Sequence, residues 1–129
     1  MAKEYFKGPA EEDRAYSLAV KATGGSTIYL AGMYKSTNEE GESLEGDFDG
    51  QVRGTFERMR VNLEKAGGTL NDVVTMTVYV TDMRNGTRFT QIRKEYFTDG
   101  YPCSALIGVA ALARPDMLVE IQAIAVIGD

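Results

Sequence analysis

Residues 117–127 read MLVEIQAIAVI, and this stretch constrains the fold more than any other part of the chain. In an extended strand, successive side chains point to opposite faces. One face is then wholly apolar and consists of Val119, Ile121, Ala123, Ala125 and Ile127. The opposite face places Glu120 and Gln122 among the large aliphatic residues Leu118, Ile124 and Val126. The stretch therefore predicts a strand with one face packed under helices and a second face that carries polar groups in apolar surroundings.

Residue patterns on either side predict the other elements of an α+β fold. We expect strands over residues 16–22, 27–34, 72–80 and 104–111, and a short leading strand over 4–7. The Gly24-Gly25 pair is typical of a hairpin between the first two of the longer strands. Helices are predicted over residues 48–66 and 87–97, and residues 35–47 form an acidic loop. Two helices can cover only one face of such a sheet, so its other face needs a partner.

The two helices have distinct sequence patterns. Apolar residues recur at steps of three and four along 48–66, with Asp47 as the expected N-cap and Gly67-Gly68 as the stop. In the second helix we expect Phe89, Ile92 and Tyr96 to point inward.

Length and composition limit the possible functions. The chain has 129 residues, which predicts a single domain over 1–129, and its net charge of −5 disfavours general nucleic-acid binding. It has no histidine, so Ser-His-Asp and Cys-His catalysis are excluded. A single cysteine, Cys103, permits no intrachain disulfide, and we expect no metal site. The N-terminal residues include no apolar signal segment and no stretch is long enough to span a membrane, so we expect a cytoplasmic protein.

The position of Glu120 leaves two interpretations open. It is either a solvated residue on the wet face of a sheet, or it lines a partly buried cleft against another subunit. In the second case burial would suit its carboxyl group to proton transfer.

Several motifs resemble the RidA/YjgF family of small imine and enamine deaminases, over nearly the whole chain from Tyr16 to Ile127. The strongest is residues 114–125, RPDMLVEIQAIA, which is similar to the closing motif of the family, with Gln122 where a second glutamate is common. Residues 16–20 (YSLAV) and 30–33 (LAGM) resemble two further family motifs. The LNDVV stretch at 70–74, the helix at 48–66 and the EYF at 95–97 match in order and spacing.

The resemblance implies a chorismate-mutase-like fold that forms a homotrimer through its helix-free sheet faces, with the helices outside. It implies a small-molecule substrate in a cleft between subunits, no metal or organic cofactor, and hydrolytic release of ammonia from reactive imines or enamines. No membrane or nucleic-acid partner is implied. The alternatives are a trimer that binds a small molecule without turnover, or another hydrolase on the same fold. RNA cleavage is disfavoured because the chain is acidic and has no histidine.

The resemblance also assigns residues to that cleft. Glu120 matches the glutamate that directs water, and Tyr16 and Gly32 match residues that shape the pocket. Ser104 stands where the family has the arginine that binds the carboxylate of the substrate, and Thr90 stands where an asparagine is usual.

The missing arginine predicts a wider, less positive pocket that binds small 2-imino acids weakly and favours bulkier or neutral ligands. Among the other arginines, Arg14 is the first candidate to replace it, ahead of Arg88 and Arg114, although the favoured interpretation of each is a solvated surface charge.

Overall fold

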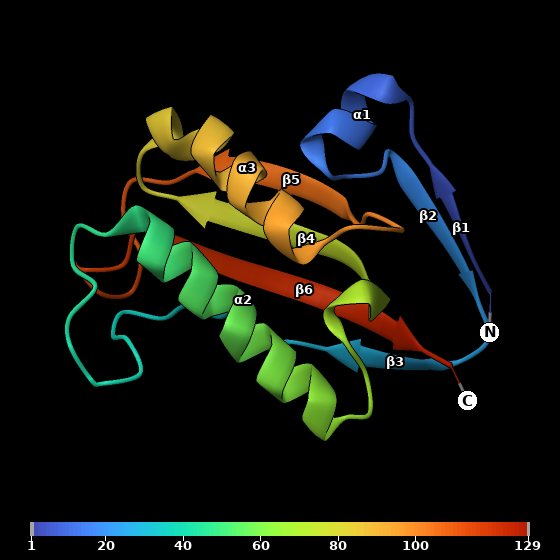
Figure 1. Cartoon of the computed structure of the whole chain (residues 1–129), viewed down its shortest axis with the longest axis horizontal. Helices are drawn as coiled ribbons and strands as arrows, with labels where there is room; N and C mark the ends of the chain where they lie inside the picture. The colour runs from blue at the N-terminus through green and yellow to red at the C-terminus, as the bar shows by residue number, and fades with distance from the viewer. Residues whose placement is uncertain (1, 129) are drawn as a thin grey trace.

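Strand β6 (Val119–Ile127) is an inner strand of the main sheet in the computed structural model, which describes residues 2–128. It pairs antiparallel with β3 (Ser26–Tyr29) on one side and with β4 (Val73–Val80) on the other. Strand β5 (Cys103–Gly108) pairs parallel with β4, which gives the order β3-β6-β4-β5. Figure 1 shows α2 (Phe48–Lys65) and α3 (Gly86–Tyr96) on the same face of this sheet, as expected for the predicted α+β fold.

The hairpin predicted between residues 16–22 and 27–34 is wrong. Strand β2 (Ala19–Thr23) pairs with β1 (Ala2–Phe6) in a separate two-stranded sheet, whereas β3 joins β6. Gly24 and Gly25 adopt positive φ angles of 75° and 79°, so they form the expected sharp turn, but the turn passes the chain from one sheet to another. A local turn pattern predicts where the chain reverses its direction, but it does not predict which strands pair.

The leading strand exists, and a short helix that the sequence patterns missed follows it. Helix α1 (Pro9–Arg14) begins at a proline and ends at Ala15, whose φ of 59° is left-handed. The Gly8 amide donates a hydrogen bond of 2.8 Å to the Glu11 carboxylate, which caps the first turn. This helix places Arg14 and Tyr16 beside α3 and the beginning of β5.

The apolar face of β6 packs into the core under the helices. Val119, Ile121, Ala123 and Ala125 are buried there, and Phe56 of α2 packs against the rings of three residues from α3 and its C-terminus: Phe89, Tyr96 and Phe97. The predicted stripe of α2 is buried through Leu63, while Ala66 is an exposed C-cap. The Asp47 carboxylate accepts a hydrogen bond of 2.9 Å from the Gly50 amide and is the expected N-cap.

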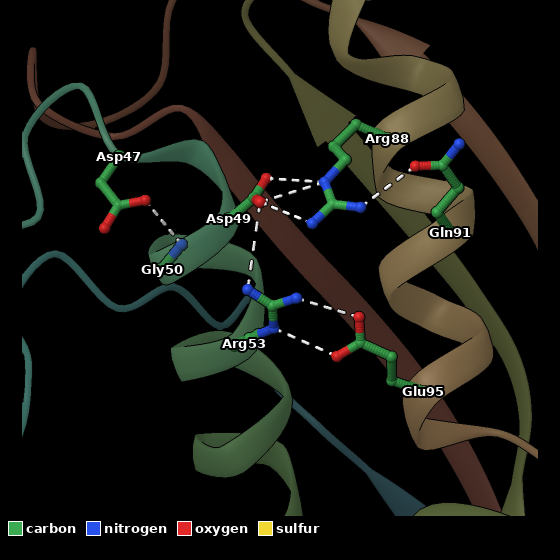
Figure 2. A network of polar contacts seen from close by, with 7 residues as sticks. All are labelled: Asp47, Asp49, Gly50, Arg53, Arg88, Gln91 and Glu95. Carbon is green, nitrogen blue, oxygen red and sulfur yellow. Dashed lines mark hydrogen bonds and ion pairs between the residues drawn. The ribbon is translucent and has the colours of Figure 1, made fainter.

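Charged side chains tie α2 to α3 on the outer surface (Figure 2). Arg88 donates to the Asp49 carboxylate at 2.7 Å, and Arg53 donates to Glu95 at 2.9 Å. Hydrogen bonds from these arginines lower the pKa of Asp49 and of Glu95. Arg88, one of the arginines considered for the cleft, is therefore part of this surface network.

The helix-free face of the sheet differs in part from the expected apolar surface. Val126 is already buried by the chain itself, and Leu118 packs against the core cluster. The exposed apolar groups are instead Tyr29, with 77% of its surface accessible, and Ile107, with 40%. Tyr29 pairs across the strands with the half-buried Ile124, so the apolar surface lies over β3 and β6 as well as β5.

Among the described residues, none of the helices is both long enough and apolar enough to cross a membrane.

Candidate functional site

The structure brings Glu120 and Gly32 into contact on the helix-free face of the sheet. Glu120 is half-buried on β6, and Gly32 lies in the segment that follows β3. A methyl group at Gly32 would collide with the Oε2 atom of Glu120 and come within 3.0 Å of its carboxyl carbon. The absence of a side chain at this position is what allows the carboxylate to lie against the backbone.

The other predicted site residues gather around a second place. Arg14, Tyr16, Thr90 and Ser104 line a cavity of about 210 Å³ together with residues of α3 and β5. Arg14 is the last residue of α1 and Tyr16 follows its C-cap, Thr90 lies on α3, and Ser104 is the second residue of β5. A larger hollow of about 540 Å³ shares Arg14, Thr90 and Leu106 with this cavity, so the two are neighbours at that edge of the molecule.

An arginine that the sequence analysis did not assign to the site lies in this cavity. Arg93 of α3 is buried, with only 4% of its surface accessible. Its Nη1 atom donates a 2.6 Å hydrogen bond to the Ser104 hydroxyl, and Nη2 donates a 3.0 Å bond to the backbone carbonyl of Arg14. The guanidinium also lies over the rings of Phe89 and Tyr16, at 5.2 Å and 5.9 Å from their centroids.

Burial lowers the pKa of Arg93 to about 10, so the group remains charged at neutral pH. Its buried Nε atom has no hydrogen-bond partner among residues 2–128. Arg93, and not Arg14 as the first candidate, is therefore the arginine whose guanidinium lies next to Ser104 in this chain. Ser104 carries no positive charge, but its hydroxyl accepts a hydrogen bond from the guanidinium of Arg93, which reaches this position from α3.

The sequence carried a signal for Arg93. This residue follows Phe89 by four positions, so it lies on the same buried face of the helix. A charged side chain in an apolar stripe is the kind of exception that marks a site.

The two groups of site residues lie on opposite faces of the sheet. Ser104 pairs with Met76, and Met76 pairs with Ala123 on the helix-covered face. Glu120 pairs with Tyr79 and points to the helix-free face. A single chain therefore does not bring Glu120 and Ser104 into one pocket.

The remaining arginine considered for the cleft lies elsewhere: Arg114 donates to Asp116 at 3.3 Å. Arg14 is exposed at the mouth of the cavity and contributes its backbone carbonyl to Arg93.

Comparison with known proteins gives a consistent result over almost the full chain. The model of the family described as endoribonuclease L-PSP matches residues 9–127. A RutC family protein from Pyrococcus horikoshii is 37% identical over 110 residues, which cover 85% of either chain. Protein DfrA from Myxococcus xanthus is 32% identical over 111 residues, or 86% of this chain and 84% of its own.

Solved structures show the same fold. The structure of the Rid family protein YyfB from Yersinia pestis is similar with a TM-score of 0.85 at 28% identity, covering 98% of this chain and all of that one. A YjgF family member from Mycobacterium tuberculosis gives a TM-score of 0.70 at 30% identity, with 98% of this chain and 100% of that chain covered.

Proposed function

The chain belongs to the endoribonuclease L-PSP family, whose members also carry the names Rid and YjgF. We propose that it is a hydrolytic deaminase of small reactive imines and enamines. In the reaction, water adds to the carbon of a C=N bond, and the C–N bond of the adduct then breaks. The products are a carbonyl compound and ammonia, so atoms balance with water as the only co-reactant.

The active site in this proposal forms between chains. Glu120 and the Ser104 cavity lie on opposite faces of one sheet, so a complete site requires Glu120 of one chain and the cavity of a neighbour. Three chains that pack their helix-free faces together, with the edge strand β5 of each at the seam, would bring the Ser104 cavity of one chain next to the neighbouring chain. This packing would also cover the exposed rings of Tyr29 and the side chains of Ile107 and Ile124. Helices α2 and α3 would remain on the outside.

Glu120 performs the proton transfers in this proposal. Its carboxylate accepts a proton from the attacking water and later delivers it to the departing nitrogen. Gly32 leaves room for this carboxylate, and a larger residue there would displace it. The observation that carries the proposal is this half-buried carboxylate, set against a glycine on the one sheet face that the chain leaves uncovered by helices.

A coupled assay tests the proposal. L-Amino-acid oxidase converts an amino acid to its 2-imino acid, and semicarbazide traps the imine that persists. The protein should lower the yield of trapped imine in proportion to its concentration, across several amino acids. If the trapped yield stays unchanged for all of them, the deaminase proposal fails. Saturable binding of a small molecule without turnover would then support a non-catalytic binding trimer.

A further inference from the structure

Arg93 is a buried cation whose charge no acidic group of the described chain balances. Its hydrogen bonds in the structure go to a neutral hydroxyl, that of Ser104, and to a neutral carbonyl, that of Arg14. Among residues 2–128 no aspartate or glutamate forms an ion pair with Arg93. By contrast, Arg53, Arg88 and Arg114 each pair with a carboxylate, and Arg14 is exposed to solvent. A buried charge is costly unless it is paired, so Arg93 favours a carboxylate from outside its own chain, either that of a bound ligand or that of Glu120 in a neighbouring chain.

Neutral acceptors use only part of the hydrogen-bonding capacity of the guanidinium. The group has five N–H donors, and two of its three nitrogens make the bonds described. The Nε donor is buried and unpartnered, and the group lines the 210 Å³ cavity. A planar carboxylate is the anion whose two oxygens best match adjacent guanidinium donors.

The size and charge of the site restrict the anion further. One buried guanidinium balances one negative charge, and the cavity of about 210 Å³ suits a molecule of a few heavy atoms. A dianion such as phosphate would leave a surplus negative charge inside a protein whose net charge is already −5. A small monocarboxylate fits both limits.

We propose that Arg93 binds the carboxylate of a small 2-imino acid, and of the 2-oxo acid formed from it, with Ser104 as the residue that positions the guanidinium. This inference rests on the proposed function for the identity of the molecule, and it replaces the expectation that bulkier or neutral ligands are favoured. The positive charge is supplied by α3 instead of β5. The serine then acts through Arg93 and not directly on the substrate.

The first test uses the native protein and two matched probes. Pyruvate and pyruvamide have nearly the same shape, but only pyruvate carries a carboxylate. Isothermal titration calorimetry should give a Kd for pyruvate at least about tenfold lower than for pyruvamide, because charge-assisted hydrogen bonds are replaced by neutral ones. Equal affinities for the two probes, or no binding of pyruvate at millimolar concentration, would overturn the inference.

The second test assigns the preference to Arg93. Arg93→Gln should weaken pyruvate binding at least about tenfold while the Kd for pyruvamide changes by less than about twofold. Arg88→Gln is the matched control, because Arg88 is on the same helix but bonds Asp49 on the outer surface. It should leave the preference for pyruvate intact. A parallel loss of both probes in Arg93→Gln would mean that Arg93 only supports the fold. If Arg93→Gln does not fold, the comparison of the two probes on native protein decides alone.

Moving the arginine from position 93 to position 104 separates ligand binding from support of the fold. Ser104→Arg alone brings a second guanidinium against Arg93 and should lower the melting temperature. The double variant Arg93→Gln/Ser104→Arg carries one guanidinium again and should regain the preference for pyruvate. If the double variant folds but does not regain the preference for pyruvate, the site does not recognise the carboxylate through a guanidinium in this cavity.

These binding results are independent of turnover. A preference for pyruvate without hydrolysis of any imine would keep the anion site and overturn the deaminase proposal. Hydrolysis of imines without a preference for pyruvate would do the reverse.

Discussion

Glu120→Gln is expected to lower the rate of imine hydrolysis about a hundredfold or more, because positioned general acid–base groups contribute factors of that size. The amide has nearly the same shape as the carboxyl group, so it should keep the contact with Gly32 and the mass of the assembly, but it cannot accept a proton from water. The measurement is the initial rate in the oxidase-coupled assay, together with light scattering of the same sample.

Glu45→Gln is the matched control for this substitution, since it makes the same chemical change at an exposed loop residue. Its rate should equal that of the native protein. If Glu120→Gln also retains the native rate, Glu120 is a structural residue on the sheet, and the protein would belong with the non-catalytic binding trimers.

Ile124→Glu should convert the proposed trimer to single chains and abolish turnover. Ile124 lies beside the exposed ring of Tyr29 on the helix-free face, and three glutamates introduced there would be desolvated close to one another in the assembly. Light scattering should return three times the 14.1 kDa chain mass for the native protein and one chain mass for the variant. Circular dichroism should show that each chain still folds, because the substitution leaves the core under the helices intact.

Val61→Glu provides the control for Ile124→Glu. Val61 is an apolar residue of α2 with 41% of its surface exposed on the side that the proposal leaves outside the assembly. It should remain trimeric and active. A native protein that is monomeric, or an Ile124→Glu variant that is still trimeric and active, would contradict assembly through the helix-free face.

Most of the main sheet and its helices could be predicted because their patterns are long and self-consistent. The alternation over β6 and the apolar stripe of α2 each repeat several times, so one residue out of place does not change the interpretation. The pairing of β2 with β1 could not be predicted in the same way. Strand pairing depends on contacts between distant segments, and the Gly24-Gly25 turn is compatible with either partner.

The candidate site shows the same limit at the level of single residues. A comparison of motifs places Ser104 where a family arginine is expected. Such a comparison aligns positions along the sequence, so it does not show which side chains from other elements lie close to Ser104 in the fold. Arg93 reaches that point from a different element, and its side chain is long enough to do so. The contact between Gly32 and Glu120 is also spatial, although both residues stood out in the sequence.

Mixing two impaired variants tests whether each active site combines Glu120 of one chain with the Arg93 cavity of another. Glu120→Gln and Arg93→Gln chains are unfolded together in equal amounts and refolded, and the hydrolysis of a 2-imino acid is measured. In a cyclic trimer with random mixing, about a quarter of the clefts receive both native residues, so about a quarter of the native activity should return. Refolding each variant alone is the control and should give only the residual activity of that variant. If the mixture is as inactive as the separate variants, although mixed trimers have formed, the site does not lie between subunits and the account is wrong.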